Sequence, residues 1–123
     1  MRITPTMENY METILLLERA NGLVRVTDIA DKMCVAKSSV HVALHSLEDR
    51  DMLTHEKYGS IHLTELGRTT AEAVYQRHVS LTAFFVRIVG LDPKTAEEEA
   101  CAVEHVLSEA AIARMSELAD KAT

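Results

Sequence analysis

The sequence is poor in cysteine, in glycine and in long apolar runs, and each shortage excludes a class of protein. Cys34 and Cys101 are the only cysteines, too few and too far apart for the disulfide framework of a small secreted domain. The 4 glycines form no glycine-rich phosphate loop, and no nucleophile motif accompanies them. No apolar run approaches the roughly 20 residues that span a bilayer, and no basic head with a long apolar core opens the chain. We therefore expect a reduced, cytoplasmic protein that is not an enzyme and has no membrane partner.

What the sequence does contain is enough apolar material for a packed interior. Hydrophobic residues make up 47% of its 123 residues, which suffices for one compact unit or for two small lobes. The formal net charge of −6 argues against strong nonspecific affinity for DNA. Residues 1–70 carry 8 basic and 10 acidic side chains, whereas residues 71–123 carry 5 and 9. Most of the acidic excess therefore belongs to the second half.

Helical patterns dominate the chain and give way to a strand pattern at one place. The helices predicted from apolar spacing cover residues 5–20, 28–33, 37–49, 65–78, 94–107 and 109–119. Their predicted N-caps are Thr4, Thr27, Thr64 and Ser108. The helix over 65–78 is expected to continue, bent, as far as Val89. Between the third and fourth helices, Met52–Lys57 and Ser60–Leu63 have the pattern of two short strands joined at Tyr58-Gly59.

This order of elements predicts a mainly α protein. A helix, a helix-turn-helix, a β-hairpin and another helix form a winged helix-turn-helix, and the remaining helices form a second lobe. The predicted recognition helix is the third, with Val40, Leu44 and Leu47 as its buried stripe. We place the division between the two domains after residue 70.

The start of the third helix is the expected DNA contact. A recognition helix presents its N-terminal residues to base edges in the major groove, and small hydroxyls or a lysine there can bond bases or phosphates. Residues expected to contact DNA are Thr27, Ala36, Lys37, Ser38, Ser39, His41 and Val42, together with Lys57 and Tyr58 at the wing tip. The alternative for Ser38 and Ser39 is helix capping. His41 and His45 have a metal-binding spacing, but we do not interpret them as ligands because they lie on the helix expected to face DNA.

A second group of residues has the chemistry of a transition-metal site. Cys101, Glu104 and His105 occupy positions i, i+3 and i+4 of one predicted helix, which directs them toward a common point. Further donors are available from Glu12 and His78, and weaker ones from Asn9 and Glu97. Carboxylate, imidazole and sulfur donors suit Mn²⁺ or Fe²⁺. Taken singly, each of these residues is more often a solvated or packed side chain than a ligand.

The residues that carry both patterns resemble the diphtheria toxin repressor family, including its manganese transport regulator branch. The resembling segments are Thr4–Glu12, Val35–Val40, Leu63–Gly67, Ile88–Asp92 and Ala100–Ser108. The resemblance implies a homodimeric, metal-activated repressor of metal-uptake or iron-linked genes, bound to double-stranded operator DNA. Residues 1–70 would be its winged DNA-binding domain and residues 71–123 its helical metal-binding and dimerisation domain, with no C-terminal SH3-like domain.

The same resemblance implies ligand roles for Glu12, His78, Glu104 and His105. Asn9 departs from it, since the manganese branch has Asp there and the iron branch has Met. Cys101 is similar to the iron branch and Glu12 to the manganese branch, and Thr82 stands where a further carboxylate is common. Both the metal, Fe²⁺ or Mn²⁺, and the number of ions, one or two per subunit, stay open. The alternative function is a winged-helix regulator that senses oxidation, through Cys101, or a small ligand without a metal corepressor.

Overall fold

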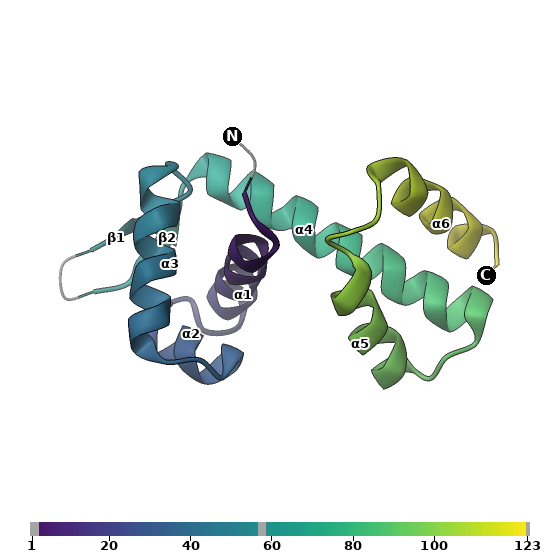
Figure 1. Ribbon diagram of the computed structural model, residues 1–123, viewed down its shortest axis with the longest axis horizontal. Helices are drawn as coiled ribbons and strands as arrows, with labels where there is room; N and C mark the ends of the chain where they lie inside the picture. The colour runs from purple at the N-terminus through teal and green to yellow at the C-terminus, as the bar shows by residue number, and fades with distance from the viewer. Residues whose placement is uncertain (1–2, 57–58, 123) are drawn as a thin grey trace. The chain divides into compact units, whose positions relative to one another are not determined.

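The computed structural model describes residues 3–56 and 59–122, which divide into two compact units, Met1–Val74 and Tyr75–Thr123. The first unit contains helices α1, α2 and α3, the hairpin β1–β2 and the start of helix α4 (Figure 1). The second contains the rest of α4, a π-helical turn and helices α5 and α6. The fold is the predicted one, a helix-turn-helix with a small wing followed by a helical domain. Among the described residues, no helix has the length and apolarity to cross a bilayer.

Helix α1 covers Pro5–Asn21 and has the predicted start and end. The Thr4 hydroxyl accepts a hydrogen bond from the Met7 backbone N–H (3.2 Å), and Pro5 occupies the first turn, where a missing N–H costs nothing. Gly22 ends the helix at φ +78°, a conformation that glycine adopts without strain. Two ion pairs tie α1 to α4 within this unit, Arg68 with Glu18 and Arg19 with Glu72. The hydrogen bond to Glu18 raises the pKa of Arg68 above its ordinary value.

Helix α2 covers Val26–Met33, and its start corrects the prediction. The N-cap residue is Arg25, whose backbone N–H donates to the Asp28 carboxylate (3.2 Å), so Thr27 lies inside the first turn and does not cap it. The helix begins at Arg25 because the carboxylate of Asp28, three residues later, accepts a hydrogen bond from the backbone N–H of the N-cap residue. Helix α3, Lys37–Asp49, has the predicted bounds, with Val40, Leu44 and Leu47 buried.

The wing is shorter than predicted. Strand β1 covers Leu53–His55 and pairs antiparallel with β2, Ile61–Leu63, with Leu53 opposite Leu63. The flanking residues keep the same register, since the Thr64 N–H donates to the Met52 carbonyl and the Glu56 N–H donates to the Ser60 carbonyl, both at 3.1 Å. The predicted turn at Tyr58-Gly59 and the predicted contacts of Lys57 and Tyr58 fall at or beyond the edge of the described residues, which resume at Gly59.

Helix α4, Glu65–Phe84, begins in close contact with the wing. Thr64 caps it as predicted, accepting from the Gly67 N–H (3.0 Å) and donating to the Asp51 carbonyl (2.6 Å). A Cβ added at Gly67 would lie 1.7 Å from the Met52 carbonyl oxygen. Only glycine permits this approach of helix to strand.

In the second unit, the helical segment continues to Val89 as expected, because α4 passes into a π-helical turn at Phe85–Val89. Helix α5 covers Pro93–Val103 and α6 covers Glu109–Lys121, the latter capped by Ser108 as predicted (Figure 1). The core combines buried residues from α4, α5 and α6 with partly buried neighbours. It consists of Leu81, Ala100 and Ile112 with Phe85, Val103, Leu107 and Met115.

The end of α5 is the second correction. The helix predicted over Lys94–Leu107 stops at Val103, because Val106 and Leu107 both donate to the Val103 carbonyl and close a turn. After this turn, Leu107 is partly buried against the core of the unit. Glu104 therefore caps the helix, and His105 lies in the turn beyond it.

Candidate metal centre and nucleic-acid interface

Glu104 is a carboxylate held away from water. It is 1% exposed and is the one charged residue buried among the residues that the structure describes. Neither of its oxygens accepts a hydrogen bond from that part of the chain. Burying a carboxylate costs roughly several kcal/mol of solvation free energy unless a nearby positive charge offsets this loss. The surroundings of Glu104 are therefore where a cation would be favoured.

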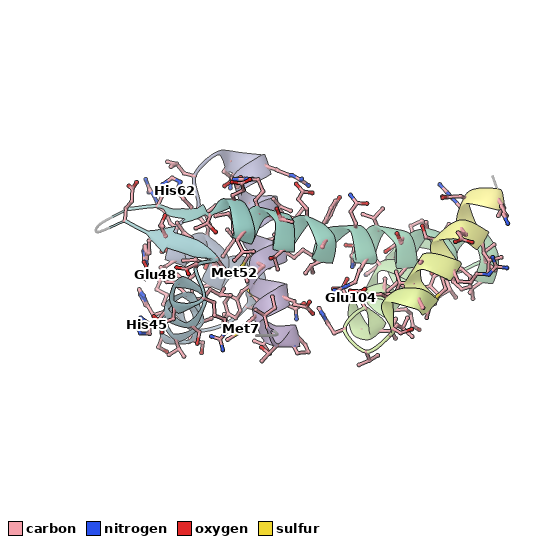
Figure 2. All side chains as sticks on the ribbon, turned by 90° about the horizontal axis from the view of Figure 1, so that it is seen from above. Met7, His45, Glu48, Met52, His62 and Glu104 are labelled. Atoms are coloured by element: carbon pink, nitrogen blue, oxygen red, sulfur yellow. The ribbon has the colours of Figure 1, made fainter. Side chains whose placement is uncertain are left out.

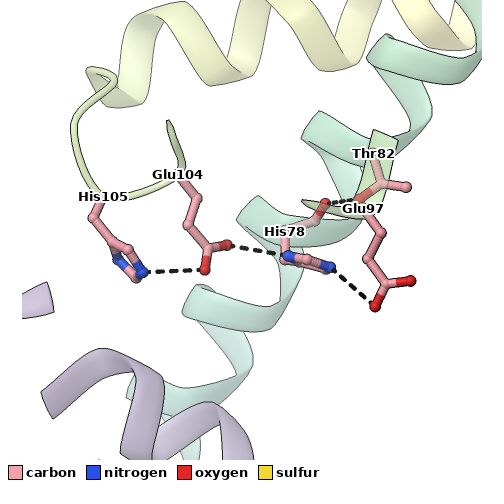
Figure 3. A network of polar contacts seen from close by, with 5 residues as sticks. All are labelled: His78, Thr82, Glu97, Glu104 and His105. Carbon is pink, nitrogen blue, oxygen red and sulfur yellow. Dashed lines mark hydrogen bonds and ion pairs between the residues drawn. The ribbon is translucent and has the colours of Figure 1, made fainter. Parts of the chain in front are cut away.

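Two imidazoles face this carboxylate within the second unit. His105 Nε2 lies 3.2 Å from Glu104 Oε1, and His78 Nδ1 lies 3.6 Å from Glu104 Oε2 (Figure 3). Their side chains are 8% and 15% exposed, respectively. The turn after α5 supplies Glu104 and His105, while α4 supplies His78. The core of this unit thus positions two nitrogen donors around one buried oxygen donor.

A second carboxylate approaches His78 from its other side. Glu97, on α5, places Oε1 3.9 Å from His78 Nε2, and its side chain is largely exposed (Figure 3). The Thr82 hydroxyl donates to the His78 backbone carbonyl (2.8 Å), not to the ring. The two ring nitrogens of His78 therefore face two different carboxylates, one buried and one solvated.

This donor set fits a divalent transition metal. Imidazole nitrogen and carboxylate oxygen are ligands that Mn²⁺, Fe²⁺ and Zn²⁺ share. The buried Glu104 charge, without a hydrogen-bond donor among the described residues, is the observation that favours a cation over a neutral polar network. The arrangement of Glu104, His78 and His105 is therefore a candidate binding site for a divalent cation.

The remaining predicted ligands lie on α5 and on α1. Cys101 is exposed on α5, and Asn9 and Glu12 lie on α1 of the first unit, both partly buried. Their ligand roles stay predictions. The structure brings together His78, Glu104 and His105, with Glu97 beside them, and it was the burial of Glu104 that the sequence pattern did not reveal.

On α3 the predicted DNA-contacting face is exposed. Ala36 is the N-cap residue, so neither Ser38 nor Ser39 caps the helix, and both hydroxyls lie on the surface. The other exposed members of the predicted set are Thr27, Lys37, His41 and Val42. The first turns of α3 contain no acidic residue, whereas Glu48 and Asp49 lie in the last turn. The N-terminal part of the helix is the part suited to phosphate and base contact.

Histidines connect α3 with the wing, a feature the sequence analysis missed. The rings of His41 and His55 stack with centroids 6.4 Å apart and planes 23° apart. His62, on β2, lies near Ser60 Oγ (2.9 Å) and Glu56 Oε1 (3.3 Å). In Figure 2, His45 projects from α3 and His62 from the hairpin. Periodicity places each histidine on a surface but does not show which surfaces meet.

Family models match both halves of the chain. Residues 2–61 match the iron dependent repressor, N-terminal DNA binding domain, and residues 64–123 match the iron dependent repressor, metal binding and dimerisation domain. The chain belongs to the iron-dependent repressor family. The family resemblance stated from sequence is confirmed, and this is a family of transcriptional repressors, not of enzymes.

Solved structures of similar proteins agree on the fold. IdeR of T. acidophilum is 26% identical, with a TM-score of 0.82 over 90% of this chain and 52% of that one. ScaR with bound Zn²⁺ is 26% identical, with a TM-score of 0.77 over 93% and 53%. The manganese regulator SloR is 24% identical, with a TM-score of 0.82 over 96% and 55%, a similarity that shows the fold alone. This member of the family spans about half the length of these relatives.

Proposed function

We propose that this protein is a metal-activated repressor that binds double-stranded operator DNA as a homodimer and controls metal-homeostasis genes. The observation that carries the proposal is the buried Glu104 carboxylate between two imidazoles, in a chain whose halves match DNA-binding and metal-binding domains. Fe²⁺ or Mn²⁺ is the proposed corepressor. When bound, the ion supplies positive charge that offsets the buried carboxylate.

Three residues form the centre of the proposed site, and four others contribute less. Glu104 supplies the buried oxygen, and His78 and His105 supply nitrogens. Glu12 is proposed as a further carboxylate ligand, on the strength of its place in the family-like segment Thr4–Glu12. The weaker candidates are Asn9, Glu97 and Cys101. Only one ring nitrogen of a neutral imidazole can ligate a metal, so the other nitrogen of His78 would donate to the carboxylate that it faces. One or two ions per subunit are proposed.

The proposed DNA contacts lie on the first turns of α3 and at the start of α2. Lys37, Ser38 and Ser39 are exposed where α3 begins, and Thr27 is exposed in the first turn of α2. Hydroxyls, a lysine and free helix N-terminal amides are suited to phosphate oxygens. In a twofold dimer, two such helices would enter successive major grooves about 34 Å apart.

The dimer would form through the second unit. Several apolar residues of this unit pack inward, since Val103, Leu107, Ile112 and Met115 belong to the core. Other large apolar side chains stay exposed in that unit: Val79, Ile88, Val89 and Val106. Burying such residues against a second copy is the usual way to remove apolar surface from water.

One observation favours a second candidate, a redox-sensing regulator. Cys101 is exposed on α5, and an accessible thiol can be oxidised where a buried one is inert. Titration of reactive thiols, with operator affinity measured before and after peroxide, separates the two functions. A redox sensor loses or gains affinity on oxidation in the absence of metal, whereas the proposed metal-activated repressor needs the metal.

The proposed function is tested by coupling between metal and DNA. Duplexes selected by the protein from a random library in the presence of Mn²⁺ serve as probes, and affinity is measured anaerobically without metal and with Fe²⁺, Mn²⁺ or Zn²⁺. Activation should raise affinity about 5- to 150-fold, the usual size of allosteric coupling. Glu104→Gln should abolish this increase, while Glu98→Gln, on the exposed face of α5, should keep it. Equal affinity with and without every metal would refute the proposal.

A further inference from the structure

Val42 is a large apolar residue on an otherwise polar surface of α3. Its side chain is 71% exposed, while the three other large apolar residues of the helix, Val40, Leu44 and Leu47, are buried. Valine is a weaker helix former than alanine or a long polar residue because its β-branch restricts χ1. Val42 therefore contributes little to the core, and its side chain is accessible for contact with another molecule.

The residues around Val42 define the surface that it belongs to. Ser38 and Ser39 are one turn before it and His45 lies one turn after it, spacings that put all four on one strip of the helix. All are exposed, and the acidic residues of α3 lie in its last turn. His41, the neighbour of Val42, stacks against His55 of the wing. The strip is therefore short and begins at the N-terminus of the helix, and His45 at its far end faces Asp49 at 3.7 Å.

Helix α3 has few of the residues that usually read purines. Its sequence, KSSVHVALHSLED, has no Arg, Asn or Gln, and its first residue, Lys37, is the one side chain suited to a bidentate contact with guanine. What Val42 offers instead is two methyl groups. The C5-methyl of thymine is the apolar group that base pairs present in the major groove.

We propose that Val42 reads the C5-methyl group of a thymine in each operator half-site. This inference rests on the proposed function, because it requires α3 to enter the major groove. It names the base feature that the helix selects. Ser38 and Ser39 would hold the helix close enough for Val42 to exclude water from the thymine methyl.

The experiment removes only that methyl group. Within a duplex selected from a random library in the presence of Mn²⁺, each thymine is replaced in turn by deoxyuridine, which keeps every hydrogen-bonding group. Burial of one methyl contributes about 0.8 kcal/mol, so the affinity of the wild-type protein should fall about fourfold per half-site at one symmetric position. At other thymines, deoxyuridine should have little effect.

Val42→Ala completes the test. This variant should bind the thymine and deoxyuridine duplexes equally, because it has lost the partner of the methyl group. Val35→Ala, an exposed valine in the turn before α3, is the matched control and should keep the full penalty. Both substitutions are at exposed sites, so circular dichroism should show unchanged folding.

The possible failures are distinguishable. If selected duplexes bind tightly but no thymine is sensitive to deoxyuridine, or if Val42→Ala keeps the penalty, the inference is wrong and the proposed function stands. If no duplex is selected at all, the proposed function fails and this inference fails with it.

Discussion

The two units use the same residue type in opposite ways. In the first unit, His41, His45 and His62 are exposed on α3 and the wing, where their partners are other surface groups. In the second, His78 and His105 are largely buried and face Glu104. A histidine on the surface can take part in contact with another molecule, whereas two histidines packed around a buried carboxylate form a site. Burial, more than residue type, separates the proposed nucleic-acid surface from the proposed metal centre.

The largest loss of stability is expected from a substitution that disrupts packing within the first unit. Gly67→Ala would place a Cβ 1.7 Å from the Met52 carbonyl oxygen, a backbone atom that cannot rotate away. We expect a loss of roughly 3 kcal/mol or more in the free energy of unfolding, at the upper end for overpacking. Urea unfolding measures it. The control is Gly22→Ala, where no atom lies within 4 Å and only the positive φ is strained. Equal losses for the two variants would contradict the close approach.

The next effect tests whether the second unit carries an uncompensated charge. Glu104→Gln keeps the shape of the side chain but removes the buried negative charge, so the metal-free protein should gain about 1–3 kcal/mol in stability. The same variant should lose the rise in melting temperature on adding Mn²⁺ that we expect of the wild-type protein. Thermal unfolding with and without Mn²⁺ checks both. A metal-free variant less stable than the wild type would show that the carboxylate is already well compensated by its histidines.

A smaller effect is expected from separating α3 from the wing. His41→Ala removes the ring that stacks on His55, an interaction worth about 0.5–1.5 kcal/mol for aromatic pairs. Operator affinity should fall a few-fold with no change in metal affinity. His105→Ala is the matched change in the second unit and should reverse this pattern, with metal affinity falling first. Isothermal titration with Mn²⁺ measures metal affinity, and DNA-binding titrations measure operator affinity. If both variants change the two affinities in the same way, the proposed difference between the units is wrong.

The smallest effect concerns a surface cap. The Asp92 carboxylate accepts hydrogen bonds from the Thr95 hydroxyl (2.7 Å) and the Thr95 backbone N–H (3.2 Å), which lower the pKa of Asp92 below its ordinary value of 3.8. Because the folded-state pKa is the lower one, the stabilisation is complete above about pH 4 and is lost as the pH falls through that lower value. Asp92→Asn should therefore be less stable than the wild type at pH 7, with a difference that narrows below pH 4. A difference in melting temperature that is constant over pH 3–7 would contradict this.

Much of the fold could be predicted because its signals are local. Thr4, Thr64 and Ser108 cap the helices they were expected to cap, and the stripe of Val40, Leu44 and Leu47 determined α3. Where two local signals competed, the prediction was wrong. Thr27 and Asp28 both suit a helix start, and the carboxylate prevailed.

The site was less predictable, because burial is a property of the packed chain. The spacing of Cys101, Glu104 and His105 suggested three equivalent donors on one helix. In the structure, Cys101 is exposed within α5, whereas Glu104 is buried at the C-cap. Leu107 packs against the core that includes Leu81 and Ile112. The apolar spacing within one helix does not predict such a contact with residues distant in sequence.

The π-helical turn at Phe85–Val89 has a consequence for how the chain tolerates changes in length. Such a turn holds one more residue than an α-helical turn does. Deleting one residue here would let the turn close as an ordinary α-helix and leave α5 and α6 in register with α4. The same deletion within Glu65–Phe84 would rotate every later side chain by about 100° around the helix axis. Deletion of one residue should therefore do less harm to the proposed metal centre within Phe85–Val89 than within α4.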